Sequence, residues 1–172
     1  LINLYAFAEC GLTSIEIPAS VTSIEYCAFY ECSGLTSIVI PAGVTSIGKY
    51  AFEYSSIYTI TFEEGSKLES IGDEAFGCCE SLTSIEIPAS VTSIGVGILE
   101  RCKNLASIKV DEGNTVYDSR NNCNAIIETN TNILIAGCKN TILLEELTGI
   151  GDSAFYGCES LTSIEIPASV TS

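Results

Sequence analysis

The stretch LTSIEIPASVTS occurs three times without a change, at Leu12–Ser23, Leu82–Ser93 and Leu161–Ser172. A fourth copy at Leu35–Ser46 reads LTSIVIPAGVTS. Internal repetition of this kind is typical of an architecture in which one small unit stacks on the next, and each unit contacts only its neighbours. The repeat is therefore the feature that decides the fold.

The spacing of the copies gives the length of the unit. Two further, diverged copies begin at Ile57 and Leu105. The isoleucine that closes each copy recurs after 22, 23, 24, 23 and 56 residues, at Ile2, Ile24, Ile47, Ile71, Ile94 and Ile150. The last interval equals one 23-residue unit plus an insertion of 33 residues. We therefore expect residues 1–172 to form a single β-rich repeat solenoid of six units, and to be a fragment of a longer array.

The fourth unit, residues 71–93, illustrates what each unit is expected to form. In its strand, Ile85 and Ile87 share one face and Glu86 points to the other, because side chains alternate along a strand. Pro88 cannot donate a hydrogen bond to a ladder, so the strand ends there. An Ile-Gly step ends a second short extended segment. The DEAF stretch that follows predicts a short helical turn.

Two residue types recur in register after the Ile-Gly step. A phenylalanine, replaced by Leu99 in the fifth unit, predicts an aromatic column in the core, formed by Phe7, Phe29, Phe52, Phe76 and Phe155. Three residues later the slot is occupied by Cys10, Cys32, Ser55, Cys79, Cys102 and Cys158. We expect these cysteines to be reduced and packed as small buried side chains, because Ser55 interrupts the column.

The insertion within the fifth unit, residues 111–144, is predicted to form a β-hairpin. A tight turn midway along it pairs Ile127 with Leu134 and Cys123 with Cys138. That register would allow a cross-strand disulfide between the two cysteines. Two adjacent free thiols are the alternative.

Composition excludes several classes of function. The chain has 22 acidic and 7 basic residues, a net charge of −15, and no histidine. Nucleic acid and anionic lipid both need clustered lysine and arginine. Without histidine, and without any C-x-x-C pair, we expect no metal site, no cofactor and no enzymatic activity. Mean hydropathy is +0.36, yet no apolar run approaches the ~18 residues of a membrane span, so no membrane insertion is expected.

The unit IGDEAFGCCESLTSIEIPASVTSIG resembles the BspA-like, or Treponema pallidum type, leucine-rich repeats. Its marks are the A-F step, the C-x-x-L-T-S-I-x-I-P strand and the V-T-S-I-G return. The resemblance implies a right-handed leucine-rich-repeat coil. It also implies a secreted or cell-surface protein of the adhesin kind, which binds proteins or glycans of a host or of a neighbouring microbe. The return after the insertion departs from this pattern at Leu147-Thr148-Gly149.

The exposed strand face is the expected binding surface of such a solenoid. A site tuned to one ligand should break the repetition, and the breaks lie at Val39, at residues 58–61, at Lys109 and at the insertion. The candidate binding residues are Glu16, Val39, Tyr58, Thr59, Thr61, Glu86, Lys109 and Glu165. The alternative function is a structural spacer, or a fibre built by end-to-end self-association of open strand edges.

Overall fold

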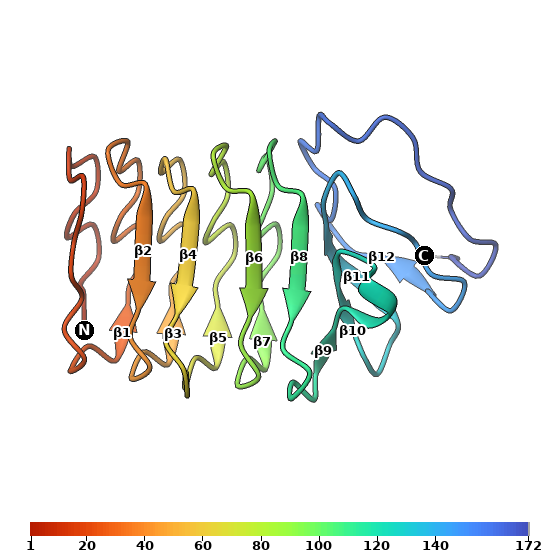
Figure 1. Cartoon of the computed structure of the whole chain (residues 1–172), viewed down its shortest axis with the longest axis horizontal. Helices are drawn as coiled ribbons and strands as arrows, with labels where there is room; N and C mark the ends of the chain where they lie inside the picture. The colour runs from red at the N-terminus through yellow and green to blue at the C-terminus, as the bar shows by residue number, and fades with distance from the viewer. Residues whose placement is uncertain (172) are drawn as a thin grey trace.

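Two parallel β-sheets run side by side along the array, one from each extended segment of the unit (Figure 1). The computed structural model describes residues 1–171. The long-strand sheet contains β2 (Ser37–Ile40), β4 (Thr59–Phe62), β6 (Ser84–Ile87) and β8 (Ser107–Val110). The short-strand sheet contains β1 (Ser23–Ile24), β3 (Ser46–Ile47), β5 (Ser70–Ile71) and β7 (Ser93–Ile94). The predicted solenoid is confirmed.

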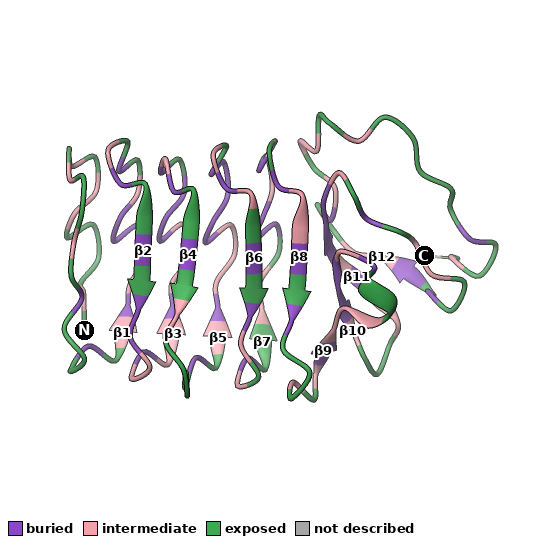
Figure 2. Cartoon of the chain, in the orientation of Figure 1, coloured by how far each residue is buried: buried purple, intermediate pink, exposed green. Residues whose placement is uncertain are grey.

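Side-chain alternation explains the long strands. In β2 and β6 exposed and buried residues alternate, so that both isoleucines enter the core between the two sheets (Figure 2). Both strands end directly before a proline, Pro41 or Pro88, as expected. β4 and β8 end instead before the acidic turns that begin at Glu63 and Asp111.

The ladder of long strands opens at one place. β2 pairs with β4, and β6 with β8, over four residues each, whereas β4 pairs with β6 only at Thr59 and Ser84. Compared with the second and fourth units, the third unit is two residues longer at the turn that follows β4 and one residue shorter before the strand. Beyond Thr59 the two strands separate, and the site described below lies at this separation.

The predicted short helical turn is wrong, and the stretch forms consecutive tight turns instead. Each unit places two residues, four positions apart, in the left-handed region with φ between 51° and 68°. In the fourth unit these are Glu74 and Cys78, with φ of 51° and 53°. Repeated left-handed residues interrupt an α-helix. They let each turn hydrogen-bond to the turn of the next coil, as Phe52 N does to Ala75 O.

The aromatic column is confirmed for the first four units. Phe7, Phe29, Phe52 and Phe76 stack nearly parallel, with ring centroids 5.1–5.6 Å apart. Leu99 continues the buried row. Phe155 does not: it packs in a second core with Ala154 and the insertion.

The cysteines of the repeat donate hydrogen bonds from coil to coil. The Sγ atoms of Cys32, Cys79 and Cys102 lie 3.0–3.2 Å from the phenylalanine carbonyl of the preceding coil. Ser55 makes the same bond to Phe29 O at 2.7 Å. The slot therefore selects a small donor, which explains why serine substitutes for cysteine. All nine cysteines are free thiols, and burial raises the pKa of Cys102 to about 12.

We expect Cys79→Ala to lower the free energy of unfolding by about 1–2 kcal/mol, because it deletes a buried donor. Cys79→Ser should cost less, because the hydroxyl restores the bond that Ser55 already makes. Urea unfolding followed by circular dichroism measures both variants. Equal losses for alanine and serine would show that the slot requires volume rather than a donor.

The insertion builds a third sheet that terminates the other two. It supplies β9 (Tyr117–Asp118), β10 (Ala125–Glu128) and β11 (Ile133–Gly137), with a 3-10 turn at Arg120–Asn122. The fourth strand of this sheet, β12 (Gly149–Ile150), follows the insertion. At β8, Val110 N donates to Ser119 Oγ at 3.0 Å, and Asn140 Nδ2 donates to Ala106 O. At β7, Ile94 N donates to Tyr117 Oη. At the outer edges of β7 and β8, side chains of the insertion therefore make the hydrogen bonds that a further strand would make.

The predicted hairpin register holds only near the turn. Ile127 pairs with Leu134 as expected, but a bulge shifts the pairing by one residue beyond Ile126. The expectation that Cys123 faces Cys138 is therefore wrong: Cys138 Sγ lies 3.5 Å from Asn124 O. Cys123 and Cys138 belong to different cores, and both are free thiols.

Candidate binding site on the strand face

A depression of about 630 Å³ lies on the exposed strand face where β4 and β6 separate. Ile60, Phe62 and Ile85 supply its apolar surface, and the first and last of these are largely buried. The polar lining comes from the turn after β4 and from the exposed positions of the strands, with Glu63, Glu64, Ser84, Glu86, Lys109 and Asp111. A partly apolar floor with a mostly acidic rim suits a polar or cationic ligand group.

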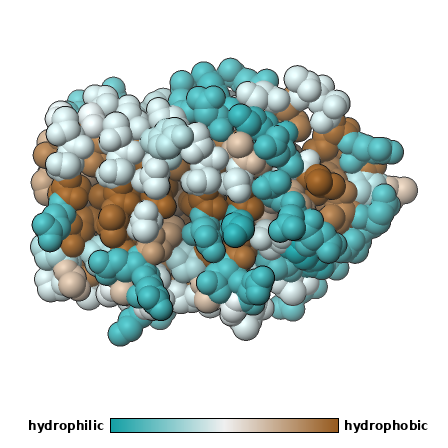
Figure 3. Space-filling model, viewed as in Figure 1, coloured by the Kyte–Doolittle hydropathy of each residue, from teal (hydrophilic) through white to brown (hydrophobic). Residues whose placement is uncertain are grey.

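A second depression, of about 670 Å³, adjoins the first and is walled by the insertion. The two share Glu86, Lys109 and Asp111. Glu86 and Lys109 are direct partners in the ladder, so opposite charges lie side by side on neighbouring strands. Figure 3 shows hydrophilic residues gathered toward the insertion end of this face.

An ion pair holds the wall of the second depression in place. Arg120 Nε donates to Asp118 Oδ1 at 2.8 Å, and its Nη2 lies 2.7 Å from Asp118 Oδ2. Arg120 Nη1 also donates to Asn132 Oδ1 at the hairpin turn. Burial opposes ionisation of Asp118, but the hydrogen bonds from Arg120 outweigh it and hold its pKa below the ordinary value. Both side chains are half-buried, so solvent and salt screen this ion pair less than a pair at the surface.

All eight candidate binding residues are exposed, but the structure brings only three of them together. Thr61, Glu86 and Lys109 line the first depression. Val39 and Thr59 lie on the same strand face, and Tyr58 directly precedes β4; all three are outside the lining of both depressions.

Glu16 and Glu165 do not lie on strands, contrary to expectation. The segments around them, in the first and sixth units, form no strand in residues 1–171. In the sixth unit the reason is the insertion, which occupies the position next to β8 that the sixth strand would need. In Figure 1 the C-terminal segment accordingly runs away from the stacked long strands.

Sequence reasoning missed the apolar floor and the wall of the second depression. Phe62 stands where the other units have isoleucine or, in the fifth unit, Val110, and this aromatic replacement is the signal that could have pointed to the floor. The wall residues Arg120, Asn121 and Asn122 lie in the insertion, which had been singled out only as a whole.

Neither a metal centre nor a membrane-spanning helix is present in the described part of the chain. No cluster of three or more Cys, Asp or Glu side chains in residues 1–171 has the arrangement of a metal site. Over the same residues no helix is long and apolar enough to cross a bilayer.

The stacked units, the paired parallel ladders and the 23-residue period define a leucine-rich-repeat solenoid. The chain belongs to the family of the BspA type leucine rich repeat region, of which six copies match residues 1–126 and 135–172. Proteins of this family are generally non-catalytic repeat proteins. None of the curated proteins compared with the chain is significantly similar to it.

Solved structures with the same architecture include a cell-surface protein and a vaccine antigen. A leucine rich cell surface protein from Faecalibacterium prausnitzii is 32% identical with a TM-score of 0.81, over 96% of this chain and 45% of that one. The pneumococcal vaccine antigen PcpA is 27% identical with a TM-score of 0.69, over 87% and 44%. A leucine-rich repeat protein from Eubacterium ventriosum is 25% identical with a TM-score of 0.62, over 87% and 46%. The chain thus spans less than half the length of each.

Proposed function

We propose that the chain is a non-catalytic binding module of a cell-surface or secreted protein. In this proposal it engages a protein or a glycan of a host or neighbouring microbe through the strand face. The observation that carries the proposal is the position of Lys109. This residue breaks the repeat and lies at the junction of the two adjoining depressions. The surface and antigen descriptions of the similar structures support the location.

The proposed mechanism is contact over an extended but shallow surface. A ligand that spans both depressions would contact the apolar floor between β4 and β6 and the charged pair Glu86–Lys109. It would also contact the wall set by Arg120. Individually weak contacts of this kind give useful affinity when several engage together.

The test is a binding screen of the whole chain against immobilised matrix proteins and glycans at physiological salt. We expect saturable binding that Lys109→Glu or Glu86→Lys weakens at least about tenfold, because each reversal sets a like charge against the ligand. Glu16→Lys is the matched control for Glu86→Lys. The two glutamates occupy the same position of identical dodecapeptides, but Glu16 lies outside both depressions. Its affinity should equal that of the wild type.

Two outcomes would contradict the proposal. One is saturable binding that Glu86→Lys and Lys109→Glu leave unchanged. The other is no binding to any surface by a chain whose circular dichroism confirms the fold. Concentration-dependent elongation on size-exclusion chromatography would then favour the spacer or self-assembling fibre.

A further inference from the structure

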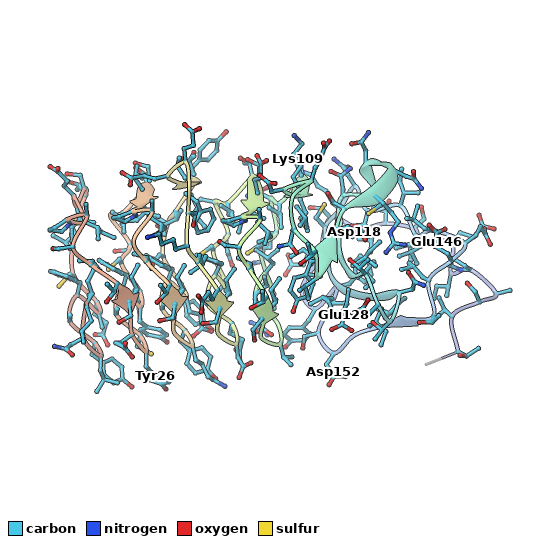
Figure 4. The ribbon with its side chains drawn as sticks, turned by 90° about the horizontal axis from the view of Figure 1, so that it is seen from below. Tyr26, Lys109, Asp118, Glu128, Glu146 and Asp152 are labelled. Carbon is cyan, nitrogen blue, oxygen red and sulfur yellow. The ribbon has the colours of Figure 1, made fainter. Side chains whose placement is uncertain are left out.

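Five of the eight tyrosines lie in the turns of the first three units. They form two rows that we call the tyrosine face: Tyr5, Tyr26 and Tyr50 in one row, Tyr30 and Tyr54 in the other. Neighbouring rings meet edge to face, with centroids 5.4–5.8 Å apart. Figure 4 places Tyr26 on the side of the molecule opposite Lys109. This surface is therefore separate from the strand-face depressions.

The tyrosine face interrupts the repeat. The positions of Tyr26 and Tyr50 carry Asp73 and Glu74 in the fourth unit, where the turn has no aromatic residue outside the core. Tyr5, Tyr26 and Tyr54 are 53%, 37% and 47% exposed, so the rings are not part of the packed core. Exposed aromatic side chains gathered over neighbouring coils are uncommon on a surface without a partner.

Carboxylates border these rings. Glu9 and Glu31 are exposed and lie close enough to Tyr30 to act on its hydroxyl electrostatically. Glu53 also acts on Tyr30, but it is buried, and burial raises its pKa to about 7, so it is not one of the carboxylates offered to solvent. A hydrogen bond with Tyr5 is the main cause that raises the pKa of Tyr26 to about 12. A hydrogen bond with Cys78 is the main cause for Tyr54, whose pKa is also about 12. The phenols are therefore neutral at physiological pH, and their π faces and the nearby carboxylates both attract cations.

The chain already contains this mode of contact. Lys49 Nζ lies 4.5 Å from the ring centroid of Tyr50 and 3.5 Å from Asp73 Oδ2. At the other end of the chain, Arg101 lies over the ring of Tyr156, with Cζ 5.1 Å from the centroid. Lys49 thus contacts both a tyrosine ring and a carboxylate. The rest of the tyrosine face exposes the same two groups to solvent.

We propose that the tyrosine face is a second interaction surface, which docks a lysine- and arginine-rich segment of a partner protein. Cationic side chains of the segment lie over the rings of Tyr26, Tyr30 and Tyr54, and the bordering carboxylates pair with their charges. The net charge of −15 draws such a segment to the chain. The rings then decide where on the acidic surface it binds.

The experiment titrates the whole chain into a fluorescently labelled oligo-arginine peptide at physiological salt, with anisotropy as the readout. Combining Tyr26→Ser, Tyr30→Ser and Tyr54→Ser should weaken binding about tenfold, because each exposed ring contributes a few-fold in affinity. The phenylalanine triple variant should bind like the wild type, because it keeps the rings. Circular dichroism confirms that both variants fold.

Tyr58→Ser is the matched control, since Tyr58 is as exposed, at 56%, but directly precedes β4 and belongs to neither row of the tyrosine face. It should bind the peptide like the wild type. Unchanged affinity in the serine triple variant would overturn the proposal and assign binding to net charge alone. Equal binding of a neutral serine-glycine peptide would overturn it as well. Lys109→Glu, which tests the strand face, should leave peptide binding intact, so the two proposals can fail separately.

Discussion

Replacing Phe52 with alanine is expected to lower the free energy of unfolding by about 3–5 kcal/mol, the largest loss from any single substitution considered. Phe52 is fully buried, and its ring stacks on Phe29 at 5.1 Å and on Phe76 at 5.6 Å. Because the column has rings on both sides of Phe52, the cavity cannot be filled by a small shift of one neighbour. Urea denaturation followed by circular dichroism measures the loss.

The fifth unit supplies the control for this prediction. Leu99 occupies the phenylalanine slot naturally and is buried there. Phe52→Leu should therefore cost only about 1 kcal/mol, because most of the volume and apolar area is kept. A loss for leucine as large as that for alanine would show that aromatic stacking, rather than filled volume, stabilises the column.

Gly72→Ala is expected to lower the free energy of unfolding by about 2–3 kcal/mol, the range for an overpacked site. A Cβ atom on Gly72 would lie 2.5 Å from Lys49 N and 2.8 Å from Gly48 C, in the coil beneath. These are backbone atoms, so no rotamer change relieves the clash, and the two coils must separate. The same close approach occurs at Gly48 and Gly95, which explains the Ile-Gly step of units three to five.

Gly11→Ala is the control for Gly72, because nothing lies within 4 Å of the added methyl group and the backbone there is not left-handed. Its midpoint of urea denaturation should stay within experimental error of the wild type. The Gly72 slot holds Glu25 in the second unit, so the constraint applies to the interior coils. A Gly72→Ala chain as stable as wild type would mean that the interior coils also tolerate wider spacing.

The period of the sequence was enough to predict the solenoid, because each unit buries its isoleucines only by stacking. Alternation along Ile85 and Ile87, and the stop at Pro88, located the long strands correctly. The turns could not be predicted, because their left-handed residues are mostly not glycine, as Glu74 and Cys78 illustrate. Neither a glutamate nor a cysteine side chain predicts a positive φ.

The site could be predicted only as a set of places where the repeat changes. Lys109 and Thr61 were found because they depart from the repeated glutamate. The depression itself lies where β4 and β6 separate beyond Thr59, and the repeat pattern does not show that separation. The prediction for Glu165 was wrong for a similar reason. Its dodecapeptide is identical to two others in the sequence, but the insertion occupies the position beside β8, so the segment has no strand to pair with.

The side-chain bonds at the end of β8 affect how the molecule would respond to tension. A force along the solenoid axis stretches the hydrogen bonds between neighbouring strands. Between β6 and β8 that force is spread over a ladder of four residue pairs. Beyond β8 the long-strand sheet transmits force through side-chain hydrogen bonds such as those of Ser119 and Asn140. Under tension, the load would therefore fall first on this joint and on the open ladder between β4 and β6, before the four-residue ladders between β2 and β4 and between β6 and β8 give way.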